Sequence, residues 1–424
     1  MDLSPSLRID HELLAVEREQ VVHCMLELTA PATPESAKRP PLHLALVIDR
    51  SGSMAGQKLA TAKACAAYLA KRLRPDDELS IVAYDDEVRL VHGLAPVGDT
   101  TAPIEAAIAM IPPGGQTNLS GGWLKGVEQL GGTPGGNGPK QVLLLSDGLA
   151  NVGVTDATEL ARMAHGATDE GVGTTTIGFG DGFDEDLMTA IADQGSGNAY
   201  FAAGVDEAAG IFAQEFEGLV SLVAQNLSVE IRASQDVSVI EVLNDYPSIA
   251  VPGGVQIQVG DAYAEEHRRI VFALQVPRLQ ALGPVSVADL VVRYVSVGEQ
   301  VAAHELHVPV LVNLVSADEA AAAAPDAQVL EEVVILKSAR AQDEARRLAN
   351  DGDFDAAGRL MRETAEGLRN IAPTSERADE LLAQADEVEG YGRTMFEGTF
   401  DAMQSKQMRY SSWQKQRGRP RKEP

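Results

Sequence analysis

Apolar and polar positions follow two different rhythms along this chain, and the change of rhythm divides it. From residue 42 to 215, short apolar runs alternate with amphipathic helical patterns. This alternation predicts an α/β fold: a doubly wound, mostly parallel sheet with helices on both faces. We expect strands at 44–48, 79–84, 88–92, 141–146, 173–178 and 199–201, and helices near 57–73, 101–110, 121–130, 156–166, 184–192 and 205–219.

From about residue 221 the rhythm changes to strand-like runs separated by turn residues, several with a period of two, which predicts a small β-sandwich. Its strands are expected at 227–231, 237–243, 254–259, 269–276, 287–295 and 304–312. Residues 20–28 also have a strand pattern, and a lone strand exposes unpaired backbone groups. The nearest available sheet is the sandwich, so the α/β domain is expected to be inserted within it.

The pattern becomes helical again after the Ala-rich tract 320–324, which we interpret as a linker ending at Pro325. Helices are expected near 328–349, 354–370 and 375–389, the last continuing toward 403 past a break at Gly390-Tyr391-Gly392. Short connections between them favour antiparallel packing, and hence a helical bundle. The predicted organisation is therefore an N-terminal segment (1–40), the α/β domain (41–218), the sandwich (219–314), the bundle (315–404) and a tail (405–424).

Charge separates the tail from the body. The chain has a formal net charge of −27, which argues against broad binding of nucleic acid or anionic membranes by the body. The segment from Lys406 to the end instead carries seven Lys or Arg and a single Glu. Its composition predicts disorder. Two interpretations stay open: a solvated end, or a segment that contacts an acidic surface of nucleic acid, of a protein or of its own chain.

The remaining composition narrows the class of protein. Two cysteines, Cys24 and Cys65, do not make a disulfide framework, and Cys65 fits a small core position in a helix. No apolar run approaches the roughly 20 residues that a membrane span needs. The first residues show no basic region followed by an apolar stretch, so no signal peptide is visible. A cytoplasmic protein is expected.

The loop after the apolar run 42–48 carries the most informative side chains. Asp49, Ser51 and Ser53 place one carboxylate and two hydroxyls at alternate positions where a strand ends and a helix begins. Ligands of parallel sheets bind outside the carboxyl ends of the strands, and small oxygen ligands suit a cation of the magnesium type. A serine at Ser53 is equally explained as a helix cap, so this segment alone leaves both interpretations open.

Two further loops test that interpretation. Asp147 follows the apolar run 142–145, and Thr117 lies in the turn 113–118 before a helix. Taken singly, each has an ordinary explanation, because Thr117 or Asn118 can cap a helix and Asp-Gly is a standard turn dipeptide. Helix capping and turn formation explain less well why both side chains lie at positions compatible with the first loop. Together with the first loop they predict a metal site.

Three segments resemble, in order, the metal-binding segments of the von Willebrand factor type A family: 47–54 (Val-Ile-Asp-Arg-Ser-Gly-Ser-Met), 115–117 (Gly-Gln-Thr) and 146–148 (Ser-Asp-Gly). The resemblance covers about residues 42–215 and implies a Rossmann-like fold with a site for Mg²⁺, or for Mn²⁺ or Ca²⁺. It implies that Ser51, Ser53 and Thr117 are hydroxyl ligands, and that Asp49 and Asp147 act largely through metal-bound water. Gln116 departs from the family's commonest spacing.

Neutral hydroxyls and only two carboxylates would leave the charge of such a cation under-compensated, and a partner's Asp or Glu would complete its coordination. No histidine lies near these loops in sequence, so a general base is missing. The leading hypothesis is a non-enzymatic scaffold that binds a protein partner through metal. The alternative is a regulatory subunit of an ATP-driven complex of the AAA+ or chelatase type, in which another chain would be the motor. A hydrolase is a distant third.

Two other motifs do not carry a site. His304-Glu305-Leu306-His307 is one residue short of a zinc motif and lies on an expected strand, where its two histidines would face opposite ways. The acidic cluster 181–186 lacks the alternating ligands of a calcium loop. We expect Asp184 to cap a helix there, with Glu185 and Asp186 in its positive first turn.

Overall fold

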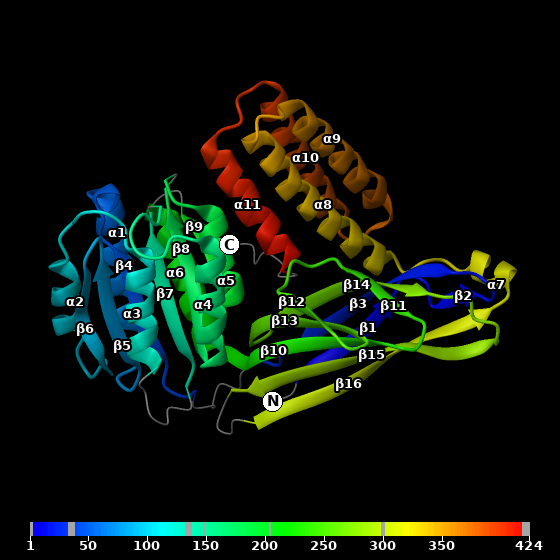
Figure 1. Cartoon of the computed structure of the whole chain (residues 1–424), viewed down its shortest axis with the longest axis horizontal. Coiled ribbons are helices and arrows are strands. Elements are labelled where there is room, and N and C mark those ends of the chain that lie inside the picture. Colours follow the sequence, from blue (N-terminus) through cyan, green and yellow to red (C-terminus); the bar gives the residue numbers. More distant parts are fainter. Residues whose placement is uncertain are drawn as a thin grey trace. The chain divides into compact units, whose positions relative to one another are not determined.

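The computed structural model describes residues 3–32, 39–131, 138–147, 149–180, 182–202, 205–297 and 302–417, without the side chains of residues 205 and 206. The chain divides into two compact units. One contains Thr33–Gln225 and Ser296–Ala302, and we call it the α/β unit. The other contains Met1–Ala32, Asn226–Val295 and Ala303–Pro424, and we call it the β/helical unit. Figure 1 shows the elements of both.

The α/β unit is built on a sheet with the order β6-β5-β4-β7-β8-β9 in the described part of the chain. All neighbours are parallel except the edge strand β6, which runs antiparallel to β5. The predicted α/β class is therefore confirmed, with a mixed sheet. Its strands are β4 (His43–Asp49), β5 (Glu78–Tyr84), β6 (Val88–Pro96), β7 (Lys140–Ser146), β8 (Val172–Phe179) and β9 (Ser196–Ala202).

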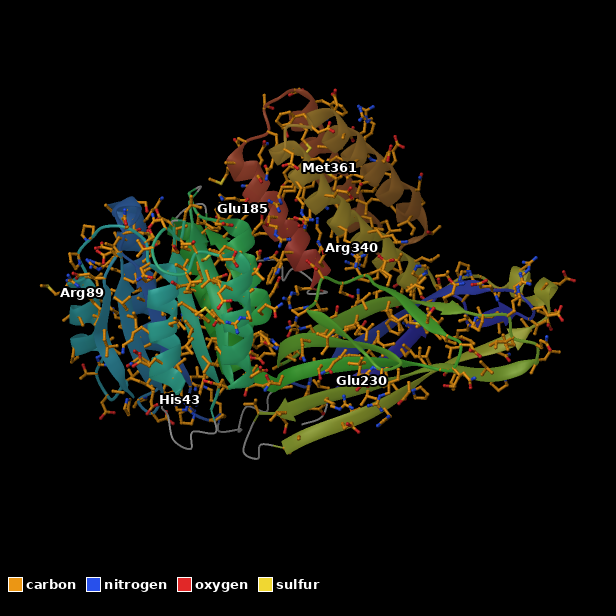
Figure 2. All side chains as sticks on the ribbon, in the orientation of Figure 1. His43, Arg89, Glu185, Glu230, Arg340 and Met361 are labelled. Atoms are coloured by element: carbon orange, nitrogen blue, oxygen red, sulfur yellow. The ribbon has the colours of Figure 1, made fainter. Side chains whose placement is uncertain are left out.

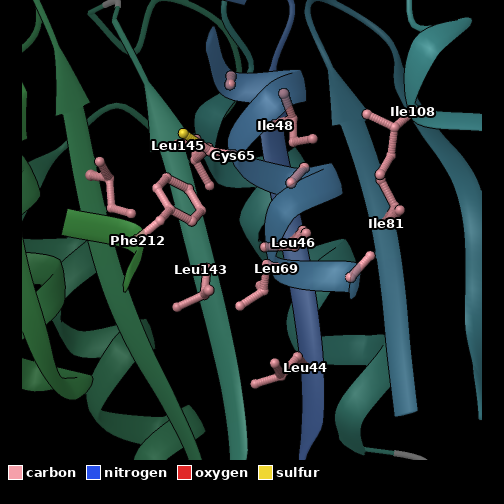
Figure 3. Close-up of a cluster of buried hydrophobic side chains, with 14 of the residues drawn as sticks. Leu44, Leu46, Ile48, Cys65, Leu69, Ile81, Ile108, Leu143, Leu145 and Phe212 are labelled. Carbon is pink, nitrogen blue, oxygen red and sulfur yellow. The ribbon is translucent and has the colours of Figure 1, made fainter. Parts of the chain in front are cut away.

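Helices cover both faces of this sheet. Their apolar residues recur every three or four positions, so each helix has one apolar side that packs on the sheet. On α1 the buried residues include Leu59, Ala62, Cys65 and Leu69, which face Leu44, Leu46 and Ile48 of β4 in one hydrophobic cluster (Figure 3). Cys65 is thus a core residue, as predicted. The helices of this unit are α1 (Gln57–Arg72), α2 (Ala102–Ala109), α3 (Leu119–Gly131), α4 (Ala157–Asp169), α5 (Glu185–Gln194) and α6 (Val205–Val220), with a 3₁₀ turn, η1 (Gly52–Met54).

The order of strands creates a switch point beside β4. The chain passes from β4 to β5 on one side of it, and later returns to place β7 on its other side. At such a reversal the connections leave in opposite directions and open a crevice at the carboxyl ends of the strands. The loops after β4 and β7 meet at this crevice.

The β/helical unit contains two sheets in the described part of the chain, of order β1-β3-β14-β11 and β12-β13-β10-β15-β16-β2. The N-terminal strand β3 pairs antiparallel with β14, with Gln20 opposite Val276 and Thr29 opposite His267. The strands are β1 (Ser4–Ile9), β2 (Leu13–Ala15), β3 (Gln20–Thr29), β10 (Leu222–Ala233), β11 (Ser238–Val242), β12 (Ser248–Val251), β13 (Gly254–Tyr263), β14 (His267–Val276), β15 (Gly283–Ser296) and β16 (Ala302–Val315).

A helical layer packs on the outer face of the first sheet. Met25 of β3 and Val271 of β14 share a buried cluster with Val329, Val333 and Leu336 of α8. Arg340 of the same helix, which is labelled in Figure 2, pairs with Glu241 of β11. The helices of this unit are α7 (Ala317–Ala322), α8 (Ala327–Asn350), α9 (Phe354–Ile371), α10 (Ala378–Phe396) and α11 (Ala402–Gln416), with a 3₁₀ turn, η2 (Ala372–Thr374).

The prediction of a disordered tail from residue 405 is wrong as far as residue 417. Residues 402–416 form α11, which begins with a capping box between Asp401 and Gln404. Trp413 is 3% exposed, and the guanidinium of Arg409 lies 3.4 Å from the carboxylate of Asp343. The basic residues therefore include a partner of an acidic side chain of the same chain. Residues 418–424 lie outside the described part.

Two smaller expectations about the bundle are also wrong. The helix α10 continues through Gly390 and Gly392, because Gly392 lies against Met361 of α9, where a side chain would meet the Met361 Cβ at 3.0 Å. The close packing offsets the roughly 1 kcal/mol that glycine costs in a helix. The Ala-rich tract 320–324 was expected to be a linker, but its first residues belong to the short exposed helix α7. This helix starts with a capping box between Ser316 and Glu319.

No helix in the described part of the chain is both long and apolar enough to cross a membrane.

Candidate metal centre

Asp49 organises the first loop of the candidate site. It ends β4 and is fully buried. Its Oδ1 accepts a hydrogen bond from the backbone N–H of Ser51 at 2.8 Å, and its Oδ2 accepts one from the hydroxyl of Ser146 at 2.7 Å. Because Ser146 ends β7, this carboxylate ties the carboxyl ends of two neighbouring strands together.

The hydroxyls of the same loop point toward the second carboxylate. Ser53 donates to the Oδ1 of Asp147 at 2.8 Å, and its Oγ lies 3.1 Å from that of Ser51. The helix α1 begins only at Gln57, and its N-cap residue is Gly56. The helix-cap explanation of Ser53 is therefore wrong, and its hydroxyl bonds to Asp147 instead.

Thr117 is held between the other two loops. Its N–H donates to the side-chain oxygen of Asn151 at 2.9 Å, and its carbonyl accepts the N–H of Asn151 at 3.1 Å. The cap of the following helix is Asn118, whose Oδ1 accepts the N–H of Gly121 at 3.0 Å. The Thr117 side chain is therefore spared from capping: it is buried, and its hydroxyl has no hydrogen-bond partner among the described residues.

Three residues of this region could not be assigned from the sequence. Lys58, on the first turn of α1, forms an ion pair with the Oδ2 of Asp147. Arg50 and Asp85 form a buried ion pair at the ends of β4 and β5, with the Arg50 Nη2 2.5 Å from the Asp85 Oδ1. In the sequence, Arg50 stands inside the first motif and Asp85 stands directly after a strand. Neither position predicts that these two residues form an ion pair with each other.

Burial and charge act on the ionisation of Asp49. Burial raises the pKa of its carboxyl above the usual range, and the negative charge of Asp147 adds to that effect. Hydrogen bonds from Ser146 and Ser51 oppose it because they stabilise the carboxylate. Lys58 supplies one positive charge beside the second of these carboxylates, Asp147.

The donor set fits a hard divalent cation. It consists of two carboxylates and three hydroxyls, all oxygen donors of the kind that Mg²⁺ prefers. None of the hydrogen bonds described above involves a histidine or cysteine, and the described residues contain no cluster of three His, Cys, Asp or Glu that could hold a metal. No hydrogen bond among the described residues engages the Thr117 hydroxyl, which leaves it available to a cation.

A comparison with protein families identifies the part of the chain that contains these residues. Residues 43–214 match the family model of the von Willebrand factor type A domain. This range begins with β4 and ends within α6, so it contains every residue of the candidate site.

Curated relatives match the chain over a longer range than the family model does. The uncharacterized protein sll0103 of Synechocystis is 28% identical over 251 residues, 57% of this chain and 59% of that protein. The chain spans less than two thirds of the length of the first curated relatives that it matches.

Solved structures resemble the chain over almost its full length. A von Willebrand factor type A protein from Catenulispora acidiphila has a TM-score of 0.75, with 16% identity over 96% of each chain. VWA2, the ArnB paralog from Sulfolobus acidocaldarius, has a TM-score of 0.62, with 20% identity over 97% of this chain and 99% of its own. At these identities the likeness concerns the fold alone.

Proposed function

Residues 43–214 are a von Willebrand factor type A domain, and from that premise we propose that this protein is a metal-dependent protein-binding scaffold. Domains of this type commonly mediate protein–protein interaction. The proposed site consists of Asp49, Ser51, Ser53, Thr117 and Asp147. The bound cation, Mg²⁺ in the first instance, would supply positive charge that attracts a carboxylate of the partner.

The observation that carries this proposal is the balance of charge at the site. The hydroxyls of Ser51, Ser53 and Thr117 are neutral, and one of the two negative charges is already compensated by Lys58. A divalent cation held there would keep excess positive charge, which an incoming Asp or Glu neutralises. Ser53 is exposed, whereas Ser51 and Thr117 are buried, so a partner would approach from the Ser53 side.

The surroundings of the site suit recognition better than catalysis. Lys58, Ser146 and Asn151 contact the proposed ligands and hold carboxylates or backbone groups in place. Catalysis by general acid or base needs a group with a suitable pKa within hydrogen-bond reach of a substrate. Leu149, two residues after Asp147, is 56% exposed. Because this exposed apolar residue follows Asp147 so closely in the sequence, we expect the partner's acidic residue to be flanked by an apolar one.

Capture of a partner from lysate tests this function. The full chain, immobilised, is expected to retain a specific protein in about 5 mM MgCl₂. It should release that protein in EDTA, because EDTA removes the divalent cation that the contact needs. Asp49→Ala should abolish capture. Glu128→Gln, which removes an exposed carboxylate on α3, is the matched control and should capture normally.

Capture that survives EDTA or Asp49→Ala would contradict the proposal. Identification of the captured protein by mass spectrometry also addresses the alternative. Recovery of an ATPase of the AAA+ class would favour the regulatory-subunit hypothesis over a general scaffold.

The role of Lys58 gives a separate prediction. Its side chain is 36% exposed and pairs with buried Asp147, so its ammonium opposes a divalent cation at the same carboxylate. Lys58→Met is expected to raise Mg²⁺ affinity by about tenfold, the effect of removing one unit charge some 5 Å away in a water-like dielectric. Titration calorimetry measures it, with Lys71→Met, an exposed residue at the far end of α1, as control. Unchanged or weaker affinity would show that Lys58 does not compete.

A further inference from the structure

A buried ion pair lies directly behind the candidate site, between residues that the proposed function does not use. Arg50 occupies the position between Asp49 and Ser51, but its side chain points away from theirs and toward β5. It meets Asp85, the residue after β5, at 2.5 Å, and the two side chains are 4% and 6% exposed. A buried ion pair is costly to desolvate unless further hydrogen bonds satisfy it. The other hydrogen bonds of Arg50 and Asp85 therefore identify the segment of chain that the pair holds in place.

Those bonds lead to the turn 113–118, which carries Thr117. The Oδ2 of Asp85 accepts the N–H of Gly115 at 2.9 Å, and its backbone carbonyl accepts the N–H of Asn118 at 2.8 Å. Asp85 thus holds the chain two residues before Thr117 and one residue after it. The carbonyl of Arg50 accepts the N–H of Gly114 at 2.6 Å, so the turn is held by both members of the pair.

The pair also explains the first of the two glycines in this turn, Gly114. A methyl group on Gly114 would lie 1.7 Å from the Asp85 Oδ2 and 2.7 Å from the Arg50 Nη1. Only a residue without a side chain lets the turn lie flat on the ion pair. The carbonyl of Gly115 in turn accepts the N–H of Gly52 at 2.9 Å, which fixes the turn against the loop of Ser51 and Ser53.

Bonding to the turn also favours the charged form of Asp85. Burial opposes ionisation, but the N–H groups of Gly115 and Glu87, together with Arg50, hold the pKa of the Asp85 carboxyl below its usual range. The carboxylate is therefore present as a double acceptor at neutral pH. A neutral residue of the same shape could not hold the guanidinium and the turn equally well.

We propose that the Arg50–Asp85 ion pair is the positioning element of the metal site, which sets the place of the Thr117 hydroxyl relative to the loop of Ser51 and Ser53. This inference rests on the proposed function, since it concerns the same site. Neither side chain is a ligand. Both act through the turn 113–118, and their effect on cation binding passes through Thr117.

The test measures Mn²⁺ affinity by titration calorimetry on the full chain, with variants at the pair and at Thr117. Asp85→Asn is expected to weaken Mn²⁺ binding at least about tenfold, a typical cost of losing a residue that orients a metal ligand. Gly114→Ala displaces the same carboxylate from the opposite side and should give a similar loss. Glu128→Gln alters an exposed carboxylate on α3 and should bind as the wild type does.

A double variant separates positioning from general damage. Thr117→Val removes the hydroxyl, so adding Asp85→Asn to it should change Mn²⁺ affinity by less than about twofold, since effects that share one route are not additive. A full additional loss in that background would overturn the proposal. So would wild-type affinity in both Asp85→Asn and Gly114→Ala.

A second readout does not depend on metal. Amide hydrogen exchange in EDTA, followed on peptides that cover residues 112–118, should be faster in Asp85→Asn, while peptides of β4 and β7 keep wild-type rates. Uniformly faster exchange across the sheet would mean a merely structural role and would overturn the proposal. Wild-type protein that binds no Mn²⁺ would instead overturn the proposed function, and the exchange data would still decide whether the pair holds the turn.

Discussion

Asp147→Asn is expected to remove most of the divalent-cation affinity of this protein. The change keeps the shape of the side chain and its bond with Ser53, but it removes one of the two negative charges at the site. Attraction between a divalent cation and a carboxylate about 4 Å apart is worth about 2 kcal/mol even in a water-like dielectric. The loss should therefore be at least about 30-fold, since each 1.4 kcal/mol is tenfold.

Two measurements check this expectation. Titration calorimetry with MgCl₂ gives the affinity directly, and the rise in unfolding temperature with added Mg²⁺ reports binding to the native state alone. Both signals should nearly vanish in Asp147→Asn and remain in Glu128→Gln. An unchanged Mg²⁺-dependent rise in Asp147→Asn would mean that the cation binds elsewhere.

Asp77→Ala is expected to cause the largest loss of stability in the α/β unit. Asp77 is fully buried just before β5. Its carboxylate accepts two bonds from the guanidinium of Arg39, at 2.7 and 2.6 Å, and one each from the N–H groups of Leu42 and Arg74. Its removal leaves buried donors unpaired at the entry to the central strand. Breaking a buried pair in this way typically costs about 3 kcal/mol or more.

The effect can be measured on the α/β unit alone, because each unit has one tryptophan. Trp123 lies in α3 and Trp413 in α11. In a Trp413→Phe background, fluorescence during urea unfolding follows Trp123 and therefore this unit. Asp76→Ala is the matched control, because Asp76 is 60% exposed and its pairing contributes little. Equal stability losses in the two variants would contradict the argument.

The contribution of Asp77 also depends on pH in a defined direction. Hydrogen bonds from Arg39, Leu42 and Arg74 lower the pKa of its carboxyl below the usual value, although burial opposes them. A group with a lowered folded pKa stabilises the protein fully above its unfolded pKa, near 4, and loses that contribution as pH falls through the folded pKa. The difference between wild type and Asp77→Ala should therefore be complete at pH 6–7 and shrink progressively below about pH 4.

The strands and helices of the α/β unit could be predicted from the sequence because burial leaves a direct trace in it. Strand β4 is buried on both faces and is a continuous apolar run, and α1 places apolar residues every three or four positions. Strand β1 leaves no such trace: it contains Pro5 and mostly exposed residues, and its pairing with β3 is all that defines it. The same holds for β2, which has three residues and pairs with the distant β16.

The tail shows a second limit of sequence reasoning. Its charge and polarity are typical of a solvated end. The partners of α11 lie far away in sequence, such as Asp343 and Asn244, whose side-chain amide donates to the carbonyl of Gln416 at 3.1 Å. Burial of Trp413 among these elements makes the helix stable where its own composition would not.

The sequence by itself determined which oxygen atoms the candidate site contains. Asp49, Ser51, Ser53, Thr117 and Asp147 each follow an element whose apolar pattern is readable, and parallel strands bring their carboxyl ends to one edge. The tertiary structure alone decided how these atoms are held and balanced, through Lys58 at Asp147 and through the Arg50–Asp85 pair behind the turn of Thr117. The physical reason is that the pattern of a chain encodes burial, whereas the choice of a charged partner depends on distances that exist only after folding.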